Sequence, residues 1–174
     1  MPVGPVLIPA QAIRRRTREL GRQITSDHKD CELVVLGLMN GSIFFLTDLL
    51  RSIKVPTRLE TCRLQSYEGA LSTGEINGLD QLQGDFENRH VLVVDDILDT
   101  GLTLGRLITS LRKLRPHSLK VAVLISKKVH RKAIVYADYV GFEIPNKFVI
   151  GYGLDYDGKY RSLPSIHLFD PGQG

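Results

Sequence analysis

Buried-strand patterns and amphipathic-helix patterns alternate along this chain, and the alternation is the feature that most restricts its fold. Apolar runs typical of fully buried strands occupy residues 33–38, 91–94 and 121–125. Residues 42–53 and 102–114 carry apolar side chains at helical spacing. Because parallel strands need crossover connections, usually helices, this order predicts an α/β fold with a largely parallel central sheet flanked by helices.

Weaker segments complete the predicted order. Residues 6–8, 58–64 and 139–142 fit short strands, and a helix is predicted over residues 9–23, opened by a proline. The stretch 66–88 is polar, rich in glycine and without a sustained pattern, and a loop of that length in a compact domain is usually functional. With 174 residues, 43% of them hydrophobic, the chain has the size of one domain with its own core.

Composition argues against several classes of protein. No apolar run approaches the roughly 20 residues of a membrane span, and the N-terminus lacks signal-peptide character, so a cytoplasmic location is expected. Cys31 and Cys62 lack metal-binding spacing and are expected to be reduced thiols. The net charge of +4 favours anionic ligands but is too dispersed to indicate nucleic acid, and the run Arg14 to Arg16 predicts a solvated helix face.

The segment VLVVDDILDTGLT, residues 91–103, joins a buried strand to a cluster of acids. Asp95, Asp96 and Asp99 stand within five residues, and their mutual repulsion needs a cation or a ring of donors to offset it. A simpler interpretation is a polar strand end with a helix cap, which accounts for Thr100. It accounts poorly for three carboxylates, so a functional site is the stronger prediction.

The loop from Asp99 to Thr103 predicts an anion site. At a helix N-terminus it offers backbone N–H groups and two hydroxyls to a phosphate, and Gly101 lets the backbone approach a ligand closely. Neither a Walker loop nor a G-x-G-x-x-G loop after a strand occurs. Carboxylates beside a phosphate site suit a phosphorylated sugar, whose hydroxyls donate to acids. In a parallel sheet, such a site is expected at the carboxyl edge.

These residues resemble the phosphoribosyl pyrophosphate (PRPP) signature of the type I phosphoribosyltransferases. Three further segments resemble the hypoxanthine-guanine branch of that family, in its order: LGLMNGSIFFLTDLL, SYEGALSTGEI and DYVGFEIPNKFVIGYGLDYDGKYRSLP. The resemblance covers nearly all of the chain after about Asp30. It implies a type I phosphoribosyltransferase fold as one domain of residues 1–174, with a core of about 25–140, a lid loop of about 66–88 and a small C-terminal hood of about 141–174 that includes the N-terminal segment.

The resemblance implies an enzyme of purine salvage that depends on magnesium (Mg2+). The 5-phosphoribosyl group of PRPP would pass to N9 of hypoxanthine or guanine, giving IMP or GMP and pyrophosphate. Family members form dimers or tetramers, so a homodimer or homotetramer is expected, with Phe44, Phe45 and Leu46 offering apolar surface. Neither a nucleic acid nor a membrane is expected as a partner.

By resemblance, one group of residues would bind PRPP. Asp95 and Asp96 would face the ribose hydroxyls and the magnesium that bridges them. The 5'-phosphate would bind to the loop made of Asp99, Thr100, Gly101, Leu102 and Thr103. The pyrophosphate would contact Arg161 and the Asn40–Gly41 loop, while Ser66 and Tyr67 of the lid would close over the reacting centre.

A second group would bind the purine. By resemblance, Asp99 would act as general acid and base at N7, Lys127 would donate to the 6-oxo group, and Phe148 would stack on the ring. The backbone of Val149 would contact the purine edge, and Asp155 would be a second magnesium ligand. Four of these residues also have a purely structural interpretation. Lys127 fits a solvated strand end, Phe148 a core residue, Asp155 a turn residue and Arg161 an ordinary surface residue.

One position departs from the family pattern. Asn40 stands where the family often has a basic residue, so a side-chain charge near the pyrophosphate is missing. The family uses this loop largely through backbone N–H groups, often in an unusual peptide conformation, and Gly41 is retained for that. Activity is therefore expected to survive, with weaker binding of PRPP or pyrophosphate. Asn146, where an acid is common, is a smaller departure.

Two other classes of function stay open. Some proteins with the PRPP motif are regulators that bind RNA or DNA, but this chain shows no helix-turn-helix and no basic stripe interleaved with aromatic residues. The segment ILDTG also resembles the active-site loop of aspartic proteases, in which two carboxylates share a proton. A single copy would require a symmetric dimer, and the alternating pattern contradicts the all-β fold of those enzymes.

Overall fold

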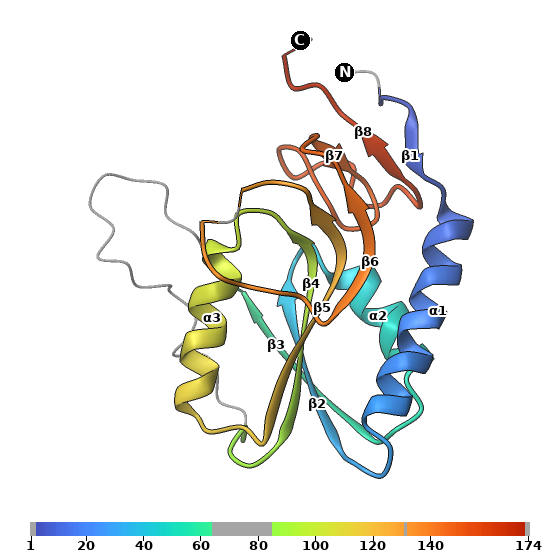
Figure 1. Ribbon diagram of the computed structural model, residues 1–174. Coiled ribbons are helices and arrows are strands. Elements are labelled where there is room, and N and C mark those ends of the chain that lie inside the picture. Colours follow the sequence, from blue (N-terminus) through green and yellow to red (C-terminus); the bar gives the residue numbers. More distant parts are fainter. Residues whose placement is uncertain (1–2, 64–84, 131, 173–174) are drawn as a thin grey trace.

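A parallel sheet of five strands forms the centre of the molecule (Figure 1). The structure is a computed structural model and describes residues 3–63, 85–130 and 132–172. The strand order is β3-β2-β4-β5-β6, and every neighbouring pair is parallel. The strands are β2 (Leu33–Met39), β3 (Thr57–Arg63), β4 (His90–Leu98), β5 (Ser118–Lys127) and β6 (Tyr139–Ile144). The predicted parallel α/β fold is confirmed.

Three helices cover the two faces of this sheet. Helices α1 (Ala10–Asp27) and α2 (Ile43–Ser52) pack on one face, and α3 (Leu102–Lys113) packs on the other (Figure 1). Successive side chains of a strand point to opposite faces, so Val35 belongs to the α1 and α2 core while Val34 belongs to the α3 core. With both faces covered, the central strands are apolar throughout, as the sequence pattern indicates.

A smaller antiparallel sheet lies at the carboxyl edge of the large one (Figure 1). Its order is β1-β8-β7, made from β1 (Val6–Ile8), β8 (Ile166–Leu168) and β7 (Val149–Ile150). It therefore joins the two ends of the chain. The sequence predicted β1 but neither β7 nor β8, because strands of two or three residues are too short to show a period and depend on their partners.

The strands that lead to the site are longer than their apolar cores. The pattern at residues 91–94 stops before the acids, whereas β4 continues through Asp95 and Asp96 to Leu98. Strand β5 likewise continues to Lys127. Ladder hydrogen bonds hold polar residues in a strand when its neighbours are in register, and Leu98 is paired with Ser126. The next residues along the two strands, Asp99 and Lys127, are thereby brought side by side.

Phe44, Phe45 and Leu46, which were not all expected to be internal, differ in burial. Phe45 and Leu46 are buried in the core, and Phe44 alone of the three is exposed. Helical geometry explains the difference, because successive side chains lie about 100° apart around the helix, and Phe45 and Leu46 turn toward the sheet while Phe44 turns away. Within the described residues, no helix combines the length and the apolar character that crossing a bilayer requires.

Candidate active site

An ion pair between Lys127 and Asp99 marks the carboxyl edge of the sheet. Lys127 Nζ lies 2.8 Å from Asp99 Oδ2, and the lysine side chain is only 11% exposed while the aspartate is 44% exposed. The register of β4 and β5 brings the two residues together from positions 28 apart in the sequence. Lys127 is therefore not the solvated strand end of the simpler interpretation. A buried cation beside an accessible carboxylate can contact a ligand with adjacent acceptor and donor atoms.

The loop after β4 ends at an uncapped helix. Gly101 is the N-cap residue of α3 and has a φ of 80°, a left-handed conformation that suits glycine. Among the residues that the structure describes, no side chain makes a capping hydrogen bond at this end of α3. The helix-cap interpretation of Thr100 is therefore wrong. The first-turn N–H groups of α3 and its positive dipole end are free to bind an anion such as phosphate.

The two adjacent acids of β4 are held without a counter-charge bonded to either carboxylate in the part of the chain that the structure describes. Asp95 Oδ1 accepts a hydrogen bond from the Asp96 N–H at 2.9 Å, and Asp96 Oδ1 accepts one from the Ile97 N–H at 2.8 Å. Burial raises the pKa of Asp95 well above its usual range, and the neighbouring Asp96 raises it further. Burial also raises the pKa of Asp96, although the charge of Arg161 acts against this. A cation or sugar hydroxyls would stabilise both ionised groups.

Glycines allow two loops to meet strand β4 at these acids. A Cβ atom on Gly41 would collide with the Asp96 carboxylate, and one on Gly153 would collide with the Gly41 carbonyl oxygen. The loop after β2 therefore touches both β4 and the segment after β7. Its Met39–Asn40 peptide bond is cis, which is the kind of unusual conformation expected of this loop.

Arg161 and Asp155 form a second ion pair at the same edge. Arg161 Nη2 lies 2.8 Å from Asp155 Oδ1, and Nη1 donates to the Gly153 carbonyl oxygen at 2.6 Å. The other carboxylate oxygen of Asp155 accepts a hydrogen bond from the Gly158 N–H at 2.8 Å. Asp155 thus has the turn role of the simpler interpretation and also orients Arg161, whose charge reaches Asp96.

Phe148 presents its ring to solvent, so its interpretation as a core residue is wrong. The side chain is 42% exposed, and its ring lies edge-on to Tyr156 with centroids 5.8 Å apart. Val149, which follows it, is buried in β7 and pairs with Leu168 of β8. Strand β7 thereby fixes the backbone while the exposed ring of Phe148 is available to stack on a planar ligand.

Comparison with known proteins decides the family. The model of the phosphoribosyl transferase domain matches residues 8–157. The chain belongs to the phosphoribosyltransferase family. A hypoxanthine-guanine phosphoribosyltransferase of Mycobacterium avium is 42% identical, with 97% of this chain and 87% of the relative aligned. One of Bacillus subtilis is 37% identical over 97% of this chain and 94% of the relative.

Solved structures agree with the sequence relatives. A hypoxanthine-guanine phosphoribosyltransferase of Bacillus anthracis superposes with a TM-score of 0.91 at 35% identity, covering 97% of this chain and 100% of that one. The predicted resemblance to the hypoxanthine-guanine branch is confirmed. The parallel sheet of this phosphoribosyltransferase excludes the all-β fold that the aspartic protease alternative required.

The acids of this phosphoribosyltransferase fit magnesium only in combination with a substrate. Among the described residues, no group of three or more histidine, cysteine, aspartate or glutamate side chains could hold a metal by itself. Magnesium, however, usually binds through one or two carboxylates together with waters and substrate phosphates. Asp95 and Asp96 supply two adjacent carboxylates, and neither forms an ion pair within the described residues.

The sequence interpretation missed the hydrogen bond that ties the segment after β7 to α2. The buried hydroxyl of Tyr152 donates to Asp48 Oδ2 at 2.6 Å. Burial raises the pKa of Tyr152, and the bond to Asp48 raises it further. The signal available in the sequence was a tyrosine placed between two glycines, Gly151 and Gly153. Tyr152 holds the turn that carries Asp155 against the body of the phosphoribosyltransferase.

The cysteines are free thiols, as expected. Cys31 is partly exposed, and Cys62 is buried in β3. Burial, with a smaller effect from the charge of Asp95, raises the pKa of Cys62 to about 11. Cys62 therefore stays protonated near neutral pH and has no nucleophilic role beside the acids.

Proposed function

We propose that this phosphoribosyltransferase transfers the 5-phosphoribosyl group of PRPP to N9 of hypoxanthine or guanine, releasing pyrophosphate and giving IMP or GMP. The observation that carries the proposal is the ion pair of Lys127 and Asp99 beside the uncapped N-terminus of α3. A 6-oxopurine has its oxygen next to N7, so a cation and a carboxylate side by side match that edge. The activity named for the relatives from M. avium and B. subtilis supports the same reaction.

The phosphate and ribose of PRPP would lie along the end of β4. The 5'-phosphate accepts hydrogen bonds from the first-turn N–H groups of α3 and from the hydroxyls of Thr100 and Thr103. The ribose hydroxyls donate to Asp95 and Asp96. Positive charge develops on the sugar as its bond to pyrophosphate breaks, and these carboxylates stabilise that charge.

The leaving pyrophosphate would face the loop after β2 and Arg161. Backbone N–H groups of Asn40 and Gly41 and the Arg161 guanidinium stabilise its growing negative charge. Asp95 and Asp96, with Asp155 as a second position, would hold magnesium, which when bound supplies positive charge to the pyrophosphate oxygens. Arg161 is oriented for this role by Asp155 at 2.8 Å.

The purine would lie between Phe148 and the ion pair. Lys127 donates to its 6-oxo oxygen, the backbone of Val149 contacts its edge, and Asp99 exchanges the N7 proton while N9 attacks the sugar. An adenine would place an amino group against the Lys127 cation, so adenine is expected to be a poor substrate. The lid residues Ser66 and Tyr67 lie outside the described residues and, like the cytoplasmic location and the dimeric or tetrameric assembly, stay predictions.

The test is a spectrophotometric assay with PRPP and magnesium, run in parallel on hypoxanthine, guanine, xanthine and adenine. We expect nucleotide formation from hypoxanthine or guanine and at least about 100-fold lower kcat in Asp99→Asn, because positioned acid–base groups contribute 100-fold or more. The control is Asp30→Asn, which changes an exposed residue outside the candidate active site and should keep full activity. No turnover of any base, with PRPP still bound, would contradict the proposal and favour a PRPP-sensing regulator.

A further inference from the structure

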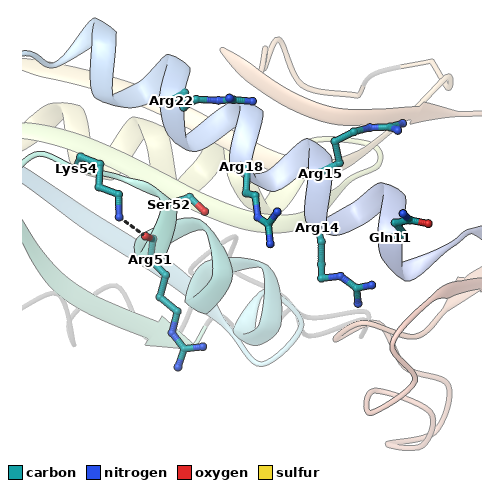
Figure 2. A pocket seen from close by; sticks show the side chains of 8 residues that line it. All are labelled: Gln11, Arg14, Arg15, Arg18, Arg22, Arg51, Ser52 and Lys54. Atoms are coloured by element: carbon teal, nitrogen blue, oxygen red, sulfur yellow. Dashed lines mark hydrogen bonds between the residues drawn. The ribbon is translucent and has the colours of Figure 1, made fainter.

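A hollow of about 780 Å³ lies between α1 and the end of α2, on the face of the molecule covered by these helices (Figure 2). Its lining is almost entirely cationic and consists of Gln11, Arg14, Arg15, Arg18, Arg22, Arg51, Ser52 and Lys54. Arg14 and Arg18 point from α1 toward the side of α2 (Figure 2). We call this hollow, with these eight residues, the arginine cleft. It shares no residue with the candidate active site.

The cleft concentrates the positive charge of the whole chain. The six cations of the cleft and the one carboxylate of the adjoining recess, Asp48, together carry a formal charge of +5. The complete chain carries only +4. The rest of the protein is therefore slightly acidic. Among the described residues, no carboxylate oxygen lies within 4.0 Å of any of the six cationic groups. The cleft is thus a local concentration of charge that no ion pair of the described residues neutralises.

Arg16, in the same arginine run, shows what a structural arginine of α1 looks like. Its guanidinium donates to the carbonyl oxygens of Val140 at 2.8 Å and Gly141 at 3.0 Å, and it pairs with Glu19 at 3.1 Å. Arg16 therefore anchors α1 to β6, which corrects the expectation of a uniformly solvated run. The arginines of the cleft make no such bonds within the described part of the chain.

The spacing of the cleft arginines is unfavourable for the isolated helix. Arg14, Arg18 and Arg22 follow one another at intervals of four residues, so their charges lie on one side of α1 over about 12 Å. Like charges at this spacing destabilise a helix, and a helix face that serves only solubility usually alternates its charges. A bound anion would remove this repulsion.

The lining also indicates which anion fits. Arginine forks recognise phosphate through paired hydrogen bonds, and five of the six cations are arginines. Among the described residues that line the cleft, none is aromatic or aliphatic, so the cleft offers no aromatic surface on which a nucleobase could stack. Its volume lies in the range of small-ligand sites. At one end α1 touches α2, because Gly21 has no side chain and Ser52 lies directly against it.

We propose that the arginine cleft binds a condensed polyphosphate, a compact anion with several phosphate groups, by charge and arginine hydrogen bonds alone. The binding is independent of the reaction proposed for the active site. It depends on the arginines of α1, and it weakens as salt rises, because phosphate contacts displace bound counterions.

The test is a calorimetric titration of the full chain with sodium tripolyphosphate and with a medium-chain polyphosphate, at low and at moderate salt. The variant Arg14→Gln/Arg18→Gln is compared with Arg112→Gln/Lys113→Gln, which removes the same charge from the exposed end of α3 on the other face of the sheet. We expect at least about tenfold weaker binding in the cleft variant, since a charged hydrogen bond is worth about that factor, and little change in the α3 variant. Arg14→Lys/Arg18→Lys should fall between wild type and the glutamine variant, because it keeps the charge but not the fork.

Four results would overturn the proposal. Equal weakening in both glutamine variants would mean that only net charge matters, and no binding by the wild-type chain would remove the site altogether. Tighter binding of a single-stranded RNA with the same number of phosphates, lost in the cleft variant, would make the cleft a nucleic-acid surface. Finally, loss of binding on addition of PRPP and magnesium, without sensitivity to the cleft variant, would assign the polyphosphate to the active site. The four residues replaced by glutamine are all exposed. The melting temperatures of both variants should therefore equal that of the wild-type chain, which confirms that the variants are folded.

Discussion

The polar residues at the two edges of the large sheet differ in how far they bond to one another. At the carboxyl edge, as far as the structure describes the chain, Asp95 and Asp96 lie together without an ion pair, and the N-terminus of α3 has no side-chain cap. At the amino edge, polar side chains satisfy one another: His90 Nδ1 lies 2.8 Å from Ser118 Oγ, and Tyr139 donates to Asp27 at 2.7 Å. The carboxyl edge keeps groups for a ligand, while the amino edge uses them to hold the fold.

This difference separates activity from stability. Substituting Asp95 or Asp96 should lower activity without lowering the free energy of unfolding, since neither carboxylate has an ion pair to lose among the described residues. Substitutions at the amino edge should have the reverse effect. The four predictions that follow test this separation, beginning with the largest expected effect.

Replacing Asp95 with asparagine should reduce activity and increase stability together. Asparagine keeps an acceptor for the Asp96 N–H but removes a buried charge. We expect kcat/KM to fall about 100-fold, and the melting temperature of the ligand-free protein to rise by about 2–4 °C, which corresponds to about 1 kcal/mol. Steady-state kinetics and thermal melts measure both. A lower melting temperature would show that Asp95 is structural, and the separation of the two edges would fail.

Replacing Phe148 with alanine should weaken purine binding selectively. The ring is 42% exposed, so little core packing is lost, but stacking on a base is worth about 1–3 kcal/mol. The KM for hypoxanthine should therefore rise about tenfold, with less than a twofold change for PRPP. Phe148→Tyr retains the stacking surface and should behave like wild type. An equal rise in both KM values would mean that Phe148 positions the edge as a whole.

Adding a charge at Asn40 should strengthen PRPP binding. Asn40 is exposed in the loop after β2, next to Gly41, which touches Asp96. In Asn40→Lys a cation near the pyrophosphate should tighten PRPP binding by about threefold to tenfold, less at high salt. Gln23→Lys adds the same charge on α1 and serves as the control. A PRPP affinity unchanged in Asn40→Lys would show that the backbone of this loop already supplies all of its binding energy.

The amino edge should respond to pH through His90. Burial lowers the pKa of His90, and the nearby His117 and His28 lower it further. Above pH about 6.5 the ring is neutral in both the folded and the unfolded state. As the pH falls below that value, the unfolded chain binds the proton first, so the free energy of unfolding decreases until the lowered pKa is passed. Chemical denaturation between pH 7 and 5 should show a shallower decrease in His90→Asn, with kcat at pH 7 unchanged; an identical slope would contradict this role.

The sequence by itself determined the main strands and helices and the segment proposed to bind phosphate. Buried strands and amphipathic helices follow from local periodicity, because a side chain's face depends only on its position in its own element. Asp95, Asp96 and the loop from Asp99 to Thr103 are contiguous, so their neighbourhood was fixed before folding. The four ordered motifs also carried the family resemblance, which the comparisons confirm.

Only the tertiary structure decided which distant residues meet. Lys127 reaches Asp99 because Leu98 and Ser126 are in register, and Gly41 reaches Asp96 because the loop after β2 lies against the end of β4. The three consecutive arginines at 14–16 diverge for the same reason, since the helix turns Arg16 toward β6 and its neighbours toward the cleft. Local pattern encodes the direction of a side chain within its element, but strand register and helix packing select what that side chain faces.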